Sequence, residues 1–304
     1  NHFIMELTIK DRKGNELTKL NANQNMTIKD LKKLYLETTK TKKISVNRQW
    51  FTHNEVKGTP IIDNTKTLKD YKVNNGDVLY LKDLGLQISW KFVFLAEYFG
   101  PIAIFLILYY FRNIIYGGGA GNVPLTFTQK AAFFMVIGHY IKRELETLFI
   151  HRFSSATMPF KNLFINCGHY WGVFGILVGY FIFHPKYTEP SYIPMNVKYV
   201  LIAAFCIFEL MNLLCHNQLK NLRRPGTTER GIPKGFGYGF VSCANYFWET
   251  LVWLTYSILT GCATSYLFLL FSFYQMTEWA LKKHKRYKDE FPNYPKERKA
   301  IIPF

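Results

Sequence analysis

Apolar and polar residues follow different patterns in three successive zones of the chain. Residues 5–83 alternate in short runs, residues 84–280 contain long apolar runs, and residues 281–304 are mostly polar and basic before an apolar end. Apolar runs of about 20 residues are typical of membrane-spanning helices, whereas short alternating runs are typical of half-buried strands. The pattern therefore predicts a soluble N-terminal part followed by a membrane body.

The first zone has the element order of a small α+β domain. Residues 5–17 (MELTIKDRKGNEL) alternate around a Gly-Asn turn, which predicts a β-hairpin. Residues 27–40 (TIKDLKKLYLETTK) place apolar side chains at helical spacing behind a capping threonine. Two further strands are expected at 47–52 and 78–81. This order is that of a ubiquitin-like β-grasp domain, which we assign to residues 1–83.

The middle zone predicts a multi-pass α-helical membrane protein with six transmembrane helices, or seven. A much larger soluble shell would be needed to cover so many apolar runs in about 190 residues. The expected spans are 91–111, 128–148, 164–183, 197–216, 246–261 and 262–280. Together with the tail they form the second predicted domain, residues 84–304.

The charges support this division. The chain has 304 residues, with 38 Lys and Arg against 21 Asp and Glu and a net charge of +17, yet residues 91–280 hold only 14 basic and 8 acidic residues. This composition excludes a disordered chain, a collagen-like repeat and a small disulfide scaffold. The five cysteines form no C-x-x-C pair, so we expect buried thiols and no metal site.

The uneven placement of basic residues predicts the orientation in the membrane. Lys and Arg gather at 143–161, at 220–234 and in the tail after residue 281, whereas the intervening loops carry few charges. Basic loops remain on the cytosolic side. An even number of spans then places the β-grasp domain, the basic loops and both termini in the cytosol.

Polar residues within the spans are candidates for function, because ionisable groups are costly at membrane depth. In HYIKRELETLFIHRFS (139–154), His139, Arg143 and Glu146 share one helical face with Lys142 at its edge. An ion-pair ladder without catalytic function is the alternative for this cluster.

Three more clusters follow. Glu209, Asn212 and His216 form a polar stripe that leads to Arg223, where an anionic phosphate could bind. Asn245 and Glu249 lie one turn apart at the start of a span, where a simple helix cap is the alternative. The basic tail contains Tyr287 and Tyr294, and a membrane-surface tail is its alternative. The four clusters would form a pocket for a large anionic cofactor, but the pattern does not select a reaction.

Several ordered motifs resemble the very-long-chain trans-2-enoyl-CoA reductase family of the steroid 5α-reductase superfamily. The resemblance extends over essentially the whole chain. Its motifs are the ubiquitin-like start, DLGLQISW (83–90), residues 139–154, TMPFKNLFINCGHYWG (157–172), LRRPG (222–226), VSCANY (241–246) and YPKERKAIIPF (294–304). The resemblance implies an endoplasmic reticulum membrane enzyme that uses NADPH to reduce the 2,3 double bond of trans-2-enoyl-CoA. This reaction is the last step of the very-long-chain fatty acid elongation cycle.

The resemblance also implies roles for individual residues. Tyr246 and Lys142 match the family's proposed catalytic pair. The phenol would donate the proton, and the lysine would either lower the pKa of that phenol or stabilise the enolate oxygen. The positions expected to bind NADPH are Asn212, His216, Arg223, Asn245, Glu249, Tyr287, Arg298 and Arg143. Tyr140 and Glu146 are expected on the substrate side. No G-x-G-x-x-G motif follows a strand, so the cofactor would lie among helices.

Two alternatives and a set of partners complete the expectations. A steroid or polyprenol reductase of the same superfamily is one alternative, although the β-grasp domain and Tyr246 favour the enoyl-CoA branch. A non-catalytic membrane complex subunit that retains the fold is the other. The expected partners are a long-chain trans-2-enoyl-CoA, membrane lipid and other fatty acid elongation enzymes, with no nucleic acid.

Overall fold

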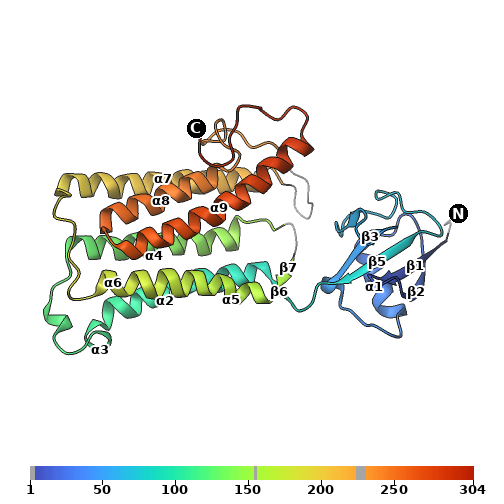
Figure 1. The fold of residues 1–304 in the computed structure, drawn as a ribbon, viewed down its shortest axis with the longest axis horizontal. Helices are drawn as coiled ribbons and strands as arrows, with labels where there is room; N and C mark the ends of the chain where they lie inside the picture. The colour runs from blue at the N-terminus through green and yellow to red at the C-terminus, as the bar shows by residue number, and fades with distance from the viewer. Residues whose placement is uncertain (1–3, 154–155, 224–230) are drawn as a thin grey trace. The chain divides into compact units, whose positions relative to one another are not determined.

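The computed structural model describes residues 4–153, 156–223 and 231–304. The chain folds into two compact units, one formed mainly by the residues up to Trp90 and one formed by the long helices that follow. Figure 1 labels their helices and strands. Each unit is described by itself.

The first unit is built on a five-stranded sheet with the order β2-β1-β5-β3-β4. The hairpin partners β1 and β2 are antiparallel, whereas β1 and β5 are parallel neighbours at the centre. This is the strand order of a β-grasp sheet, as the sequence predicts. The elements are β1 (Met5–Asp11), β2 (Glu16–Ala22), α1 (Ile28–Thr38), η1 (Val46–Arg48), β3 (Gln49–His53), β4 (Pro60–Ile61) and β5 (Val78–Asp83).

Local signals in the sequence explain these elements. Gly14 turns the hairpin with a φ of +90°, a conformation that glycine adopts without steric cost. The hydroxyl of Thr27 accepts a 3.2 Å hydrogen bond from the backbone N–H of Asp30 and so caps α1, as expected. The buried core between α1 and the sheet contains only residues from 5 to 81. This domain therefore has an apolar core of its own.

A second, two-stranded sheet follows that the sequence did not predict. It pairs β6 (Gln87–Ser89) with β7 (Thr157–Pro159) in antiparallel register. The strands are too short for an alternation to be recognisable, and their partners lie about 70 residues apart. They bring two of the family-like motifs, 83–90 and 157–172, into one local structure.

The second unit contains long helices that run side by side (Figure 1). Each of the six predicted apolar runs forms a long helical segment. The elements are α2 (Trp90–Tyr110), α3 (Arg112–Ile115), η2 (Ala120–Asn122), α4 (Phe127–Phe149), α5 (Lys161–Cys167), the π-helical η3 (Gly168–Val178), α6 (Gly179–Phe183), α7 (Met195–Asn221), α8 (Ala244–Thr260) and α9 (Ala263–Glu290).

Three helical segments among the described residues are long and apolar enough to cross a membrane. They are Trp90–Tyr110, Lys161–Phe183 and Met195–Asn221. The helix α8 has only 17 residues, and α4 carries the polar run that begins at His139. The chain is thus a mostly helical protein with three candidate membrane spans, and the count of six remains a prediction.

Aromatic side chains hold the helices together. Phe174 of η3 stacks on Phe105 of α2 with ring centroids 5.4 Å apart, and its other neighbours include Trp253 of α8 at 4.8 Å. Gly100 of α2 allows Trp171 to approach so closely that a Cβ would lie 2.0 Å from the indole ring. Such packing fixes the register between α2, η3 and α8.

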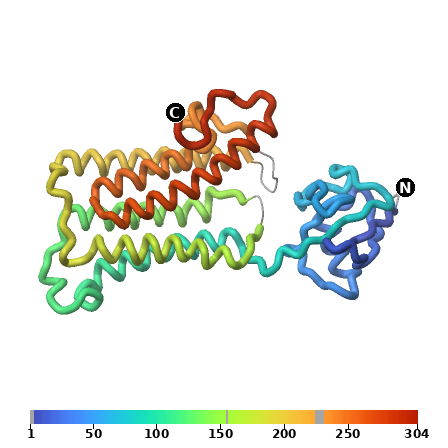
Figure 2. The backbone as a smooth tube through the Cα atoms, in the orientation of Figure 1, coloured from blue at the N-terminus to red at the C-terminus, as the bar shows by residue number. Residues whose placement is uncertain are grey.

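The C-terminal residues are tied to the loop that precedes α8. The helix α9 continues to Glu290, ten residues beyond its predicted end, because its polar second half still forms helical hydrogen bonds. The chain then returns, and Ser242 N–H donates to the carbonyl of Lys299 at 2.8 Å. Figure 2 follows this return. The tail is therefore folded against the loop rather than being an unstructured segment.

Candidate functional site

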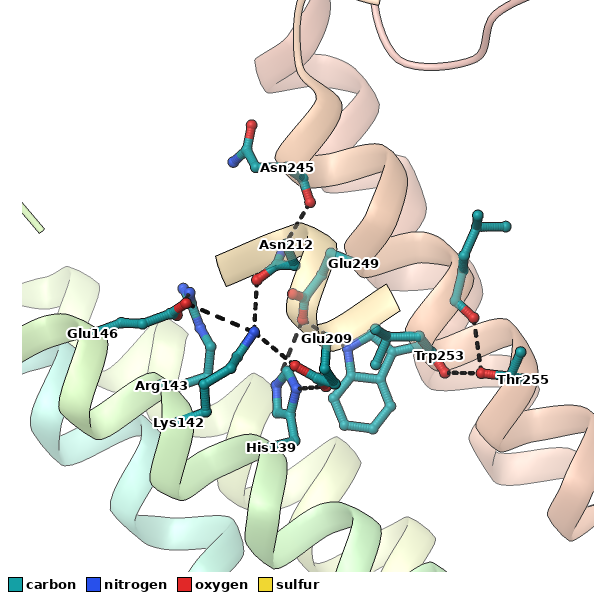
Figure 3. Close-up of polar contacts among 12 residues, drawn as sticks. His139, Lys142, Arg143, Glu146, Glu209, Asn212, Asn245, Glu249, Trp253 and Thr255 are labelled. Carbon is teal, nitrogen blue, oxygen red and sulfur yellow. Dashed lines mark hydrogen bonds and ion pairs between the residues drawn. The ribbon is translucent and has the colours of Figure 1, made fainter. Parts of the chain in front are cut away.

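Ionisable side chains from α4 and α7 meet between the helices (Figure 3). Lys142 of α4 places Nζ 2.6 Å from Oε2 of Glu209 and 2.7 Å from Oδ1 of Asn212, both on α7. One turn earlier, Nδ1 of His139 lies 2.5 Å from Oε1 of Glu209. Glu209 therefore binds two basic residues at once.

A second group of contacts continues the network along the same helices. Arg143 pairs with Glu146 through Nη1 and Oε2 at 2.5 Å, and its Nη2 donates to the hydroxyl of Tyr98 at 2.8 Å. Oε1 of Glu146 lies 2.9 Å from Nδ1 of His216 on α7. The predicted cluster on α4 and the predicted stripe on α7 thus form one network.

This network is almost removed from water. The side chains of Glu146 and His139 are 1% and 2% exposed, and those of Glu209 and Lys142 are 12% and 16% exposed. Burying charges costs several kcal/mol per ion unless partners compensate for the lost solvent. Lys142 and Arg143 pair with Glu146 along α4 itself, as an ion-pair ladder would, but further partners come from a helix about 70 residues away. The network joins α4 to α7.

Asn212 connects this network to the start of α8. Its Nδ2 donates a 2.9 Å hydrogen bond to the backbone carbonyl of Asn245, while its Oδ1 accepts from Lys142. Tyr246 follows Asn245 directly, but its half-buried ring packs against Cys243, Met276 and neighbouring apolar side chains. No hydrogen bond or cation–π contact joins Lys142 to Tyr246 among the described residues. Their catalytic pairing remains a prediction.

Two residues predicted to bind the cofactor have buried polar atoms without hydrogen-bond partners. Oδ1 of Asn245 is one, although this residue is only 6% exposed. Nε and Nη1 of Arg298, also 6% exposed, are the others, and the guanidinium lies 5.3 Å from the ring centroid of Tyr294. Unsatisfied buried groups are rare in proteins and call for a ligand or water. An amide oxygen and free guanidinium donors suit the amide and phosphate groups of a nicotinamide dinucleotide.

The folded tail explains how Arg298 comes to lie near α8. The backbones of Val241 and Lys299 form a parallel bridge, and Cys243 N–H donates to the carbonyl of Ala300 at 3.1 Å. Tyr287 is 2% exposed and stacks on Tyr294 with centroids 5.4 Å apart. The loop before α8 and the tail therefore form one buried structure that contains several aromatic side chains.

Other residues predicted to bind cofactor or substrate are either hydrogen-bonded within the protein or fully buried. Arg223 donates from Nη1 to the carbonyl of Arg152, and residues 224–226 of its motif lie outside the described residues. Glu249 accepts a 2.9 Å hydrogen bond from Trp253 Nε1. Tyr140 is fully buried, with its hydroxyl unbonded. Their roles toward cofactor and substrate remain predictions.

Three side chains have the composition of a metal-binding set. One potential ligand atom from each of Glu146, His151 and His216 lies within 4.8 Å of the others. Burial, together with the charges of Arg143 and His216, lowers the pKa of His151, which keeps the ring neutral. However, Arg143 Nη1 already pairs with Glu146 and lies 3.2 Å from His216 Nδ1. A metal ion would be placed against this guanidinium, so the set is a poor metal site.

Glu97 is a buried carboxylate and Glu209 a largely buried one, and neither is among the predicted site residues. Glu209 was seen only as part of the polar stripe, although it lies at the centre of the network. Glu97 of α2 is 2% exposed and accepts a 2.7 Å hydrogen bond from Asn166 Nδ2. An acidic residue within an apolar run was the available signal for both.

Comparisons with known proteins identify the family to which this chain belongs. A family model described as 3-oxo-5-alpha-steroid 4-dehydrogenase matches residues 156–304. A very-long-chain enoyl-CoA reductase of Dictyostelium discoideum is 42% identical over 299 residues, which cover 97% of each chain. The chain belongs to the very-long-chain enoyl-CoA reductase family. A trans-2,3-enoyl-CoA reductase-like protein of Homo sapiens is 35% identical over 81% of this chain and 69% of its own.

Two of the solved structures that match this reductase are ubiquitin-like domains, and each covers less than a third of its chain. The ubiquitin-like domain of an Arabidopsis thaliana protein covers 27% of the chain and 80% of its own, at 13% identity and a TM-score of 0.23. The C-terminal ubiquitin-like domain of mouse tubulin-specific chaperone e covers 28% and 92%, at 19% identity and a TM-score of 0.24. The β-grasp assignment rests on the strand order of the sheet itself.

Proposed function

We propose that this reductase uses NADPH to reduce the 2,3 double bond of a long-chain trans-2-enoyl-CoA, as the last step of very-long-chain fatty acid elongation. The observation that carries the proposal is the ammonium group of Lys142, held between Glu209 and Asn212 inside a helical bundle of this family. A fixed cation in a water-poor site can stabilise negative charge that develops during a reaction.

Lys142 is assigned to the thioester oxygen of the substrate. When NADPH is bound, it supplies the hydride for the β-carbon of the enoyl group. Negative charge then develops on the thioester oxygen, and a positioned ammonium lowers the energy of that charge. The contacts of Lys142 with Glu209 and Asn212 hold its chain in one orientation, so little reorganisation accompanies the reaction. Of the two roles left open by the sequence, stabilising the enolate is the one that these contacts support.

Tyr246 is assigned as the proton donor to the α-carbon. Its hydroxyl has no hydrogen-bond partner among the described residues and is therefore available to a substrate. The backbone of the preceding Asn245 is held by Asn212, which also binds Lys142. This chain of contacts places the two assigned groups on connected elements, α4, α7 and α8, without a direct bond between them.

The cofactor assignment rests on the unsatisfied atoms at α8 and the tail. Asn245 Oδ1 would accept from the nicotinamide amide, and the free donors of Arg298 would bind a phosphate. Asn212, His216, Arg223, Glu249, Tyr287 and Arg143 complete the proposed set. Tyr140 and Glu146 are proposed on the substrate side.

We further propose an endoplasmic reticulum location with six spans and both termini in the cytosol. The excess of basic residues at 143–161, at 220–234 and in the tail supports this orientation. Residues 1–83 would form the cytosolic β-grasp domain, and residues 84–304 the catalytic domain. Other elongation enzymes are proposed partners of the former.

The test is reduction of trans-2-hexadecenoyl-CoA by the purified chain in nanodiscs. We expect loss of reduced-nicotinamide absorbance matched by formation of the saturated acyl-CoA, identified by mass spectrometry. The proposal fails if an enone steroid is reduced and the acyl-CoA is not. Turnover of neither substrate would favour a non-catalytic subunit.

Exchanging Tyr246→Phe tests the assigned proton donor. We expect turnover to fall about 100-fold or more, in the range typical of a lost general acid, while the dissociation constant for NADPH changes little. Tyr274→Phe is the matched control, because this tyrosine on α9 is 69% exposed and outside the site. Normal turnover by Tyr246→Phe would contradict the assignment.

A further inference from the structure

A groove of about 680 Å³ runs between α4 and α7, beside the network of ionisable groups. This volume falls within the range of ligand sites, about 300–1,000 Å³. Most of its lining is apolar. The ionisable groups His139, Lys142 and Glu209 lie together on it, whereas the basic side chain of Lys130, near its other end, is exposed to solvent. The other lining residues are Phe127, Ala131, Phe134, Met135, Gly138, Ile202, Phe205 and Cys206.

The groove extends along much of α4. Its lining follows α4 from Phe127 to Lys142, which at about 1.5 Å per residue corresponds to roughly 22 Å of helix. Half of a bilayer's hydrocarbon core is only about 15 Å thick. The groove can therefore accommodate a chain at least as long as an ordinary lipid tail. Phe134, which is 66% exposed, lies at an open side of the groove.

Gly138 leaves space at the polar end of the groove. It lies within α4, one turn before Lys142, where glycine is a poor helix former. No atom of the protein lies within 4 Å of the position that a Cβ would occupy. The space beside Gly138 is therefore not needed for packing against another helix.

We propose that this groove binds the acyl chain of the substrate, with the thioester end beside Lys142 and the methyl end toward Phe127. The inference rests on the proposed function and identifies its acyl-chain subsite. An apolar lining that ends at a cation matches an alkyl chain attached to a polar carbonyl. A phospholipid also joins alkyl tails to ester carbonyls and a phosphate, so the binding measurement below distinguishes it from an acyl-CoA.

Narrowing the groove at Gly138 tests the proposal. In Gly138→Leu the new side chain occupies the groove, and we expect kcat/KM for trans-2-hexadecenoyl-CoA relative to trans-2-hexenoyl-CoA to fall about 50-fold. That change corresponds to excluding about three methylenes at ~0.8 kcal/mol each. Gly138→Ala should lower the ratio less, because its side chain is smaller.

Gly168→Leu is the matched control. This glycine in η3 also has no atom within 4 Å of a Cβ position, but it does not line the groove. We expect its ratio to equal that of the unaltered chain. A folded Gly138→Leu variant with an unchanged ratio would overturn the proposal. If the unaltered chain reduces neither substrate, the proposed function fails instead, and the groove is judged by binding alone.

Cys206 provides that binding measurement. It lines the groove and is exposed, whereas Cys167 is half-buried and the other three cysteines are buried. We expect palmitoyl-CoA to slow the modification of Cys206 by N-ethylmaleimide at least tenfold, whereas acetyl-CoA, which has no free thiol to consume the reagent and no long chain, should have no effect. Cys206→Ser identifies the modified residue by loss of the signal. Unchanged modification with palmitoyl-CoA, or equal protection by phospholipid, would refute an acyl-CoA subsite.

Discussion

Replacing Glu209 with glutamine removes the negative charge that Lys142 and His139 share. Glu209 Oε2 lies 2.6 Å from Lys142 Nζ, and Oε1 lies 2.5 Å from His139 Nδ1. Breaking a buried ion pair by removing one partner costs about 3–5 kcal/mol. Lys142 retains Asn212 at 2.7 Å and Glu146 at 3.7 Å, so the lower value of about 3 kcal/mol applies.

The change should lower both stability and turnover. At roughly 2–4 °C per kcal/mol for a unit of this size, the Tm should fall by about 6–12 °C. Turnover should fall as well, because Lys142 loses the contact that orients it. The measurements are thermal unfolding in detergent and reduction of trans-2-hexadecenoyl-CoA.

The double variant Lys142→Met with Glu209→Leu separates the two effects. Replacing both members of a buried pair by apolar groups can be nearly neutral for stability, so the Tm should recover in part. Turnover should not recover, since the ammonium group is gone. Glu278→Gln is the control, because its contact with Lys282 at 3.8 Å is exposed to solvent and should contribute little. If the Tm of the double variant is as low as that of Glu209→Gln, the loss of stability does not come from the unpaired Lys142. If the double variant retains normal turnover, Lys142 does not have the assigned role.

Two further predictions concern the tail and the N-terminal domain. Arg298→Ala should raise the KM for NADPH about 10- to 100-fold, the value of a lost charge-assisted hydrogen bond, with little change in the KM for acyl-CoA; equal changes in both would argue against a cofactor contact. The Arg48 guanidinium, which donates to Asp83 at 2.7 and 3.0 Å, holds the pKa of Asp83 below its usual 3.8. The stability from this pair is therefore present above the unfolded pKa and is lost as pH falls below about 5 through the folded value. Trp50 fluorescence of a 1–83 fragment should show this loss, and Asp83→Asn should lack it.

The fold was largely predictable because its signals are local. Each long apolar run predicts a helix from its own residues, and six such helices form at the expected places. The Thr27 cap and the turn at Gly14 likewise depend on a few neighbouring residues. The end of α9 was not predictable from hydropathy, because its polar second half remains helical without being apolar.

The sequence by itself determined the helices, the β-grasp order, the charge-poor middle zone and the family, since these follow from composition, periodicity and motifs. Only the tertiary structure decided which polar side chains meet. Lys142 bonds to Glu209 and Asn212 on α7, and no hydrogen bond joins it to Tyr246 in the described part of the chain. The tail brings Arg298 to the loop before α8. These partners lie about 60–70 residues apart, and no local pattern encodes a contact that depends on how whole helices pack.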